Sequence, residues 1–249
     1  MAHTITLHHL NASRSNRIFW VLEELNLPYK VQVHFRLPTK RAPPSLKQVS
    51  PLGRAPALEL DGDLLTESAY IVHTLLSLPE VQKAAKDDEI DVQTENTKDD
   101  IFWSHFAEGS QLNLLQAIGT IGATSQVWRK GGLPGLPELS EEQKSGIEKY
   151  SGWLTTIFFK DAAQNTFDLA ESFLEKQDTI FFSGTNKPGE GDFMMFFAIH
   201  SLFDSTWPGL AFNVGPNLKK WHETVLARPA AQRALEREKK EEEQNKSRI

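Results

Sequence analysis

The sequence predicts an α/β domain with a mixed β-sheet and covering helices, followed by an all-α domain that forms a helical bundle. Its first 80 residues alternate short strand-like stretches with amphipathic helical segments, whereas helical periodicity dominates after residue 99. A length of 249 residues accommodates two cores, because domains commonly contain about 100 to 150 residues. We therefore assign residues 1–80 to the α/β domain, 81–99 to an acidic linker and 100–249 to the helical domain.

The first elements are predicted to form a strand, a helix and a second strand. Ile5–Leu10 has the pattern of a strand, and a polar loop follows at residues 11–15. From Asn16 the apolar residues recur every three or four positions, as in an amphipathic helix that ends before Pro28. Tyr29–Phe35 then alternates apolar and polar side chains, which is typical of a strand. Such a βαβ unit has parallel strands.

The second half of this domain is predicted to be a hairpin followed by a helix. Residues 36–53 form a proline-rich loop with room for one short helix at 45–49. Two short strands, at 57–60 and 64–65, flank an Asp-Gly-Asp turn, which indicates a β-hairpin. A helix then begins at residues 66–68 and ends before Pro79. The order βαβ, loop, ββα matches a thioredoxin-like arrangement.

The helical domain is predicted from apolar positions that repeat with helical spacing. Helix-breaking residues at Gly131–Gly135 lie within an insert, Gln126–Gln143, to which the sequence assigns no role. The charged tail from Leu235 is expected to be a solvated or frayed helix, and no partner motif is visible in it. Four helices are predicted before it, at about 100–124, 140–176, 191–203 and 216–226.

Composition and charge exclude several classes of protein. The apolar fraction of 39% and the charged fraction of 24% are ordinary for a globular protein. No apolar run approaches the roughly 18 residues of a membrane-spanning helix, and the first residues lack the layout of a signal peptide. A cytoplasmic protein without an integral membrane segment is therefore expected. The net charge of -6 argues against nucleic acid as a partner, because binding phosphates requires an excess of Lys and Arg.

The absence of cysteine restricts the chemistry further. It excludes disulfides, thiolate zinc sites and any mechanism in which a sulfur of the protein is the nucleophile. Successive side chains in the predicted first strand point to opposite faces, which separates His8 from His9. No histidine in the predicted helices has a second histidine at i+3 or i+4. We therefore expect no metal site.

Three local patterns, correctly spaced, carry a resemblance to a known family. They are L-N-A-S-R-S-N-R-I-F-W-V-L-E-E-L at residues 10–25, P-L-G-R-A-P-A-L at 51–58 and L-T-E-S-A-Y-I at 65–71. Together they resemble the serine-type glutathione transferases of fungi and bacteria. The resemblance implies glutathione as co-substrate, a small hydrophobic electrophile as second substrate and a homodimer. It is specific in the N-terminal third and looser in the helical half.

The resemblance implies that Ser13 is the catalytic hydroxyl. A free thiol has a pKa of about 8.5, so the reactive thiolate of glutathione must be stabilised at neutral pH. A serine hydroxyl and the N-terminus of the following helix can do this. The loop has neither of the family's alternatives, since the first tyrosine is Tyr29 and cysteine is absent. The choice between Ser13 and Ser15 stays open, as does a role of either as a simple helix cap. Arg17, four residues on, is counted among the glutathione-binding residues.

The other two patterns are predicted to bind the rest of glutathione. The resemblance implies a cis peptide at Ala55-Pro56, which turns the Ala55 backbone outward to pair with the cysteinyl part. The alternative is an ordinary trans proline that begins an edge strand. Ser68 can receive the γ-glutamyl carboxylate and Glu67 the ammonium group, although a simple helix cap is the alternative. Lys40 and Arg54 are candidates for binding the glycyl carboxylate.

The helical domain is predicted to supply the pocket for the electrophile. Phe106, Ser110 and Leu114 recur at four-residue spacing and can form an apolar wall with one hydroxyl. A core helix shows the same stripe, and both interpretations stay open. Related enzymes commonly have a tyrosine at the position of Phe106, so a proton donor is missing here. The family's capping box is half kept, with Asp192 present and Gly189 in place of serine or threonine, and it is expected to support folding.

The leading hypothesis is an enzyme that adds the glutathione thiolate to an electrophile or reduces an organic hydroperoxide with it. The alternative is a non-catalytic ligand carrier or scaffold of the same fold, since fold does not determine function. Glutathione-dependent isomerisation is a third hypothesis, and no sequence feature distinguishes it from the others.

Overall fold

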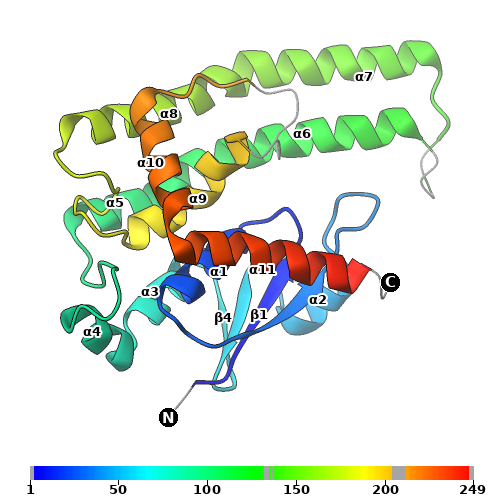
Figure 1. Cartoon of the computed structure of the whole chain (residues 1–249). Coiled ribbons are helices and arrows are strands. Elements are labelled where there is room, and N and C mark those ends of the chain that lie inside the picture. The colour runs from blue at the N-terminus through cyan, green and yellow to red at the C-terminus, as the bar shows by residue number, and fades with distance from the viewer. Residues whose placement is uncertain (1–2, 132–134, 136, 204–210, 247–249) are drawn as a thin grey trace.

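A four-stranded mixed sheet lies beneath a layer of long helices in the computed structural model, which describes residues 3–131, 135, 137–203 and 211–246 (Figure 1). The strand order is β2-β1-β3-β4. β1 pairs with β2 in parallel, while the β1-β3 and β3-β4 pairs are antiparallel. The strands are β1 (Ile5–Leu10), β2 (Lys30–His34), β3 (Ala57–Leu60) and β4 (Asp63–Thr66). The predicted βαβ and ββα units are confirmed.

The register of the strands brings four chain segments to one edge of the sheet. Leu10 at the end of β1 is opposite His34 at the end of β2. On the other side His8 of β1 is opposite Ala57, the first residue of β3, which in turn is opposite Thr66 at the end of β4. The segments that follow β1, β2 and β4, and the one that precedes β3, therefore meet at this edge, which we call the loop edge.

The helices of the N-terminal part also follow the prediction. The apolar face of the first helix is packed into the core, where Ile18, Phe19 and Trp20 have no exposed surface. The segment predicted as a linker includes most of the fourth helix. These helices are α1 (Asn16–Glu24), α2 (Pro44–Val49), α3 (Ser68–Leu76) and α4 (Pro79–Lys86).

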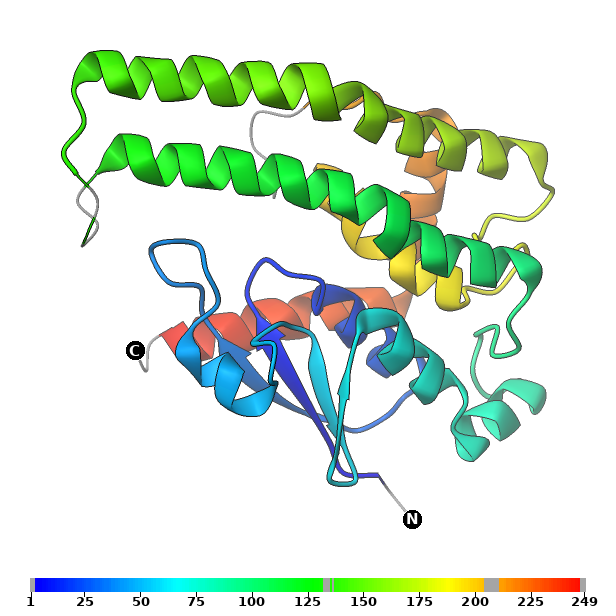
Figure 2. The same ribbon diagram turned by 180° about the vertical axis from the view of Figure 1, so that it is seen from behind.

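Long helices make up the rest of the described chain, and two of them run antiparallel as an extended hairpin (Figure 2). Each contains a π-helical turn where the sequence predicts a regular α-helix. Gly131 and Gly135 both have positive φ angles, of 65° and 82°, and residues 132–134 of the predicted break lie outside the described residues. Among the described helices, none has the length and apolar character needed to cross a membrane. The elements are α5 (Lys98–Phe106), η1 (Ala107–Leu112), α6 (Asn113–Lys130), α7 (Glu141–Leu154), η2 (Thr155–Lys160), α8 (Asp161–Lys176), α9 (Glu190–Phe203), α10 (Pro216–Ala227) and α11 (Pro229–Lys246).

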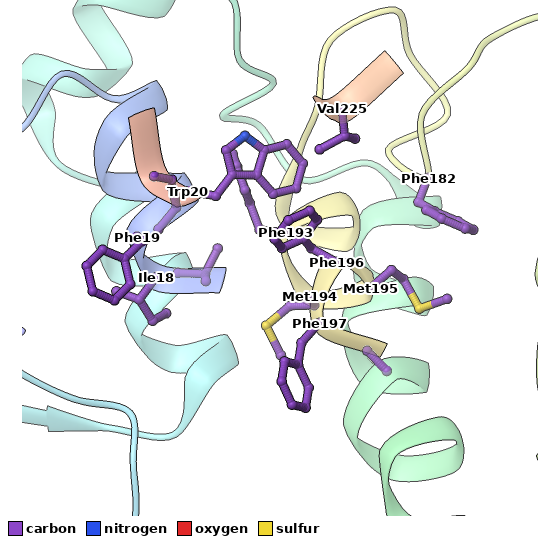
Figure 3. Close-up of a cluster of buried hydrophobic side chains, with 14 of the residues drawn as sticks. Ile18, Phe19, Trp20, Phe182, Phe193, Met194, Met195, Phe196, Phe197 and Val225 are labelled. Atoms are coloured by element: carbon purple, nitrogen blue, oxygen red, sulfur yellow. The ribbon is translucent and has the colours of Figure 1, made fainter. Parts of the chain in front are cut away.

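One aromatic cluster joins the two parts of the chain (Figure 3). The Trp20 ring of α1 packs against Phe193 and Phe196 of α9, with centroid distances of 4.6 and 4.9 Å. All three side chains are at most 1% exposed. Truncating a buried aromatic side chain of this size costs about 3 to 5 kcal/mol of stability. The helical part is therefore held to α1, directly beside the loop edge.

Asp192 ties three segments of the helical part together. It is fully buried and accepts hydrogen bonds from the backbone N–H groups of Phe182, Ser183 and Gly189 and from the indole N–H of Trp221, all at 2.7 to 3.0 Å. Burial raises the pKa of Asp192 more than these hydrogen bonds lower it, and the resulting pKa is about 6. These contacts agree with the predicted support of folding.

Steric crowding explains why glycine, and not serine or threonine, is found at the capping position 189. A Cβ atom at Gly189 would lie 2.4 Å from Oδ1 of Asp100. That carboxylate also accepts the backbone N–H of Gly191 at 3.0 Å and forms a capping box with Thr97. The side chain of Asp100 thus occupies the space that a serine at position 189 would need.

The charged tail from Leu235 is helical, as predicted, but the expectation of a solvated or frayed helix was wrong, because Arg237 and Glu242 contact the N-terminal part. α11 is a regular helix that packs along α1 (Figure 1). Its buried face consists of Ala230, Ala231 and Ala234, which are too small to give a clear apolar stripe in the sequence. Its arginines bind the N-terminal part, with Arg233 on Glu23 at 3.0 Å and the Arg237 guanidinium 4.1 Å from the centre of the Tyr29 ring.

Candidate functional site

The loop edge carries most of the residues predicted to bind glutathione. Figure 2 shows the loops after β1 and β2 projecting toward the helices that follow α5. Ser13 lies in the first of these loops and Lys40 in the second, while Arg54, Ala55 and Pro56 precede β3 and Glu67 and Ser68 follow β4. The topology therefore gathers all three sequence patterns at one edge.

The two serines of the first loop have different surroundings. Ser13 is 7% exposed, whereas Ser15 has no exposed surface. The Ser13 Oγ lies 2.7 Å from the Ser15 Oγ and accepts the backbone N–H of Ser15 at 3.2 Å. Ser15 is the N-cap residue of α1, but its side chain makes no capping hydrogen bond. Ser13 is therefore the more accessible hydroxyl, and Ser15 connects it to the interior.

His9 lies beneath this loop and binds the C-terminal helix. Its Nδ1 is 2.7 Å from the Ser15 Oγ, and its Nε2 is 3.0 Å from Oε1 of Glu242. Glu238 lies 3.7 Å from the same Nε2 and accepts the side-chain N–H of Asn16 at 2.5 Å. The side chains of His9, Glu238 and Glu242 each offer a ligand atom within 4.8 Å of the others, an arrangement that can also hold a metal ion. Sequence spacing gave no sign of this group, because His9 is more than 200 residues away from the two glutamates.

Arg36 connects the loops that follow β1 and β2, and the sequence analysis missed it. Its guanidinium donates to the carbonyl oxygens of Asn11, Ala12 and Lys40 at 3.0 to 3.1 Å. Its backbone N–H also donates to Oδ1 of Asn11 at 2.8 Å. Arg36 thus holds the loop of Ser13 against the loop of Lys40. A lone arginine after a predicted strand gives no signal for such a role.

The peptide before β3 is cis, as the resemblance implied, and not an ordinary trans proline. Pro56 is buried and Ala55 half-buried. Since β3 begins at Ala57, the backbone of Ala55 lies just outside the paired part of the strand.

The turn into α3 has an unusual backbone. Glu67, an exposed residue, has φ 66° and ψ 118°, a combination that costs a non-glycine residue on the order of 1 to 3 kcal/mol. Ser68 follows as the buried first residue of α3. Lys40 also has a positive φ, of 65°. Backbone strain of this kind concentrates at ligand sites.

Arg17 occupies a different position from the one the sequence suggested. Its side chain has no exposed surface, and its Nη1 donates to Glu108 of η1 and contacts the Met194 Sδ at 3.6 Å. Arg14 binds the other oxygen of Glu108 at 2.5 Å. Burial raises the pKa of Glu108, but the charges of Arg17 and Arg14 outweigh this and hold it below its ordinary value. This placement favours a supporting role for Arg17, beneath the loop, with Glu108 as a counter-ion that the sequence analysis missed.

Of the residues predicted to line the electrophile pocket, Phe106 and Leu114 lie on either side of the π-helical turn and Ser110 lies within it. Phe106 is half-buried and packs on Phe102 and Trp103, with ring centroids 5.8 and 5.0 Å apart. Leu114 is also half-buried against the core, and Ser110 is exposed. The wider π turn changes the relative direction of residues before and after it, so the four-residue spacing no longer defines one face.

Comparisons with known proteins agree with this architecture. Residues 7–83 match the family described as glutathione S-transferase, N-terminal domain. Glutathione S-transferase 3 of Schizosaccharomyces pombe is 42% identical over 113 residues, less than half of either chain (45% of each). Glutathione S-transferase 1 of Saccharomyces cerevisiae is 26% identical over 229 residues, which is 90% of each chain.

Solved structures share the fold over nearly the whole chain. The glutathione transferase URE2P6 of Phanerochaete chrysosporium, solved in complex with oxidized glutathione, has a TM-score of 0.60 at 23% identity and covers 95% of this chain and 97% of its own. A glutathione S-transferase from Xylella fastidiosa has a TM-score of 0.65 at 14% identity, covering 94% and 98%. At these identities the likeness shows the arrangement of the helices and strands.

Proposed function

Because the chain belongs to the glutathione transferase superfamily, we propose that it binds glutathione at the loop edge, activates its thiol with Ser13 and transfers it to a small hydrophobic electrophile. The same thiolate can reduce organic hydroperoxides. The chain contains no cysteine, so the reacting sulfur is that of glutathione. The observation that carries the proposal is the convergence of the Ser13 loop, the cis Ala55-Pro56 peptide and the Glu67-Ser68 turn at one edge of the sheet.

In this proposal Ser13 donates its hydroxyl to the sulfur of glutathione. Lowering the pKa of the thiol by about two pH units makes the thiolate dominant at neutral pH and requires about 2.7 kcal/mol of preferential stabilisation. The Ser13 Oγ accepts the N–H of Ser15, so its one hydroxyl proton can be donated either to the Ser15 Oγ at 2.7 Å or to the sulfur of bound glutathione. The start of α1 directly after the loop adds the favourable end of a helix dipole.

The remaining parts of glutathione are assigned to the other segments of the loop edge. The backbone of Ala55, outside the paired part of β3, is suited to bind the cysteinyl part as an added strand does. Ser68 at the start of α3 receives the γ-glutamyl carboxylate, and the exposed Glu67 receives the ammonium. Lys40 and Arg54, both exposed, are assigned in this proposal to the glycyl carboxylate. The oxidized glutathione bound by URE2P6 supports this assignment of ligand class.

The test compares wild type with Ser13→Ala in the conjugation of glutathione to an aryl halide. Removing one donor to a developing anion lowers kcat about 100-fold in other enzymes, and we expect a loss of that order. The Kd for glutathione should change by less than about threefold, because Ser13 is one contact among several. Equal turnover in the variant would remove Ser13 from its role. Retention on immobilised glutathione without activity toward a broad electrophile and hydroperoxide panel would support a non-catalytic ligand carrier instead.

A further inference from the structure

A continuous chain of hydrogen bonds runs from the proposed catalytic serine to the surface of the C-terminal helix. The Ser13 Oγ lies 2.7 Å from the Ser15 Oγ, which lies 2.7 Å from Nδ1 of His9. Nε2 of His9 lies 3.0 Å from Oε1 of Glu242 on α11. Ser15 and His9 have no exposed surface, whereas the side chain of Glu242 is 23% exposed and that of Glu238 is 16% exposed. The chain therefore begins near the ligand site and ends at solvent on another face.

The chemistry of the partners sets the direction of each bond. An ionised carboxylate only accepts, so Nε2–H of His9 donates to Glu242. In the neutral ring Nδ1 is then the acceptor, and it receives the hydroxyl proton of Ser15. The oxygen of Ser15 in turn accepts the hydroxyl proton of Ser13. A carboxylate, an imidazole and a hydroxyl in this order form the arrangement by which enzymes move protons to and from a hydroxyl group.

We propose that Ser13, Ser15, His9 and Glu242 form a proton relay that removes the thiol proton of glutathione, an inference that rests on the proposed function. The S–H bond breaks and its proton passes to the Ser13 Oγ, as the proton of Ser13 passes to Ser15 and that of Ser15 to Nδ1 of His9. The products are the thiolate and an imidazolium beside Glu242. The imidazolium keeps this proton and, stabilised by the carboxylates of Glu242 and Glu238, remains as the counter-charge of the thiolate. No electrons are exchanged.

The groups around His9 suit this role. Glu238 and Glu242 face its Nε2 from α11, and Ser15 faces its Nδ1 from the first loop. Phe19 of α1 packs edge-on at a centroid distance of 5.1 Å and carries no charge. Burial and the neighbouring His8 and His9 lower the pKa of His34 to about 4, and the His34 ring therefore carries no charge at neutral pH. The charges that act on His9 are therefore chiefly those of the two α11 carboxylates.

The test removes both carboxylates at the far end of the relay while leaving Ser13 untouched. The double variant Glu238→Gln/Glu242→Gln is compared with Glu236→Gln/Glu243→Gln, which makes the same change of charge on the exposed face of the same helix. The measurement is the ultraviolet absorbance of the thiolate of bound glutathione as a function of pH, together with the pH profile of kcat/KM. The relay predicts that the midpoint rises by about one pH unit in the first variant, a tenfold loss of thiolate below the midpoint. The control should titrate like wild type.

A second pair of variants tests the middle of the relay. Ser15→Ala interrupts it and should raise the midpoint in the same way, while Ser15→Thr keeps the hydroxyl and should restore most of the effect. Thermal midpoints and the Kd for glutathione identify any variant that is merely misfolded. Identical titrations of wild type, Ser15→Ala and the Glu238/Glu242 variant would overturn the relay and leave the proposed function intact. Failure of the wild-type protein to form any thiolate with glutathione would overturn the proposed function itself.

Discussion

Replacing Glu108 by Gln should destabilise the protein by about 3 kcal/mol. The variant keeps the size of the side chain but leaves the charge of Arg17 without its counter-ion. Arg17 has no exposed surface, and its Nε and Nη2 have no hydrogen-bond partner among the residues that the structure describes. Removing one member of a buried ion pair costs about 3 to 5 kcal/mol. We take the lower end, because 28% of the Glu108 side chain is exposed.

The assay is urea unfolding followed by tryptophan fluorescence, supported by thermal unfolding. A loss of about 3 kcal/mol corresponds to a decrease in Tm of about 6 to 12 °C in a chain of this length. The matched control is Asp87→Asn, which removes an exposed ion pair with Lys83 and should leave the urea midpoint and the Tm nearly unchanged. The double variant Arg17→Met/Glu108→Leu removes both charges and should recover most of the loss.

The pH dependence gives an independent check of the same pair. The pKa of Glu108 lies below its ordinary value in the folded state, so the unfolded chain binds the proton more readily. The stabilisation is therefore present above a pH of about 4.3 and is lost as the pH falls further. The difference between wild type and Glu108→Gln should shrink on acidification. A loss below 1 kcal/mol at neutral pH, or a double variant less stable than the single one, would refute this account of Arg17.

Four further predictions concern other parts of the molecule. Gly189→Ser should lower the Tm although serine is a better helix cap, because its Cβ would lie 2.4 Å from Asp100; Asp100→Ala in the same chain should relieve the loss. Burial raises the pKa of Asp100 to about 7, so the folded state binds the Asp100 proton more readily than the unfolded chain does. The free energy of unfolding contributed by Asp100 therefore declines by about 1.4 kcal/mol per pH unit between about pH 4 and 7. Asp100→Asn should remove that slope in urea titrations. Arg36→Ala should raise the KM for glutathione severalfold, because three backbone carbonyls in two loops lose their donor, whereas Arg41→Ala in the same region should not. Light scattering should give about twice the chain mass of 28.1 kDa, as expected for a homodimer, and a monomer would contradict that expectation.

The elements of the N-terminal part were predictable because their signals are local. The alternation at residues 29–35 and the helical spacing after Asn16 each lie within one element. The turn between β3 and β4 is marked by Asp-Gly-Asp in the sequence itself. The convergence of Ser13, Ala55 and Ser68 follows from the strand order, for which the βαβ and ββα units give the β1-β2 and β3-β4 pairs and the structure gives the β1-β3 pair. The cis peptide at Ala55-Pro56 came from the family resemblance, not from the residues alone.

The partners of these elements were not predictable because they come from distant parts of the chain. Glu108 binds Arg17 and Glu242 binds His9, but nothing in the sequence distinguishes these two glutamates from the acidic residues of a solvated surface. α11 packs through alanines, so its buried face carries little hydrophobic contrast with its charged neighbours. The π-helical turns likewise cannot be recognised from residue composition. The turn at Ala107–Leu112 interrupts the single helical face that the spacing of Phe106, Ser110 and Leu114 predicted.

A crystal structure of the protein with glutathione bound tests the central claim most directly. The account predicts the sulfur within hydrogen-bonding distance of the Ser13 Oγ, the cysteinyl backbone paired with Ala55 and the γ-glutamyl group at Glu67 and Ser68. A sulfur directed away from the first loop, or a tripeptide bound elsewhere on the molecule, would contradict it.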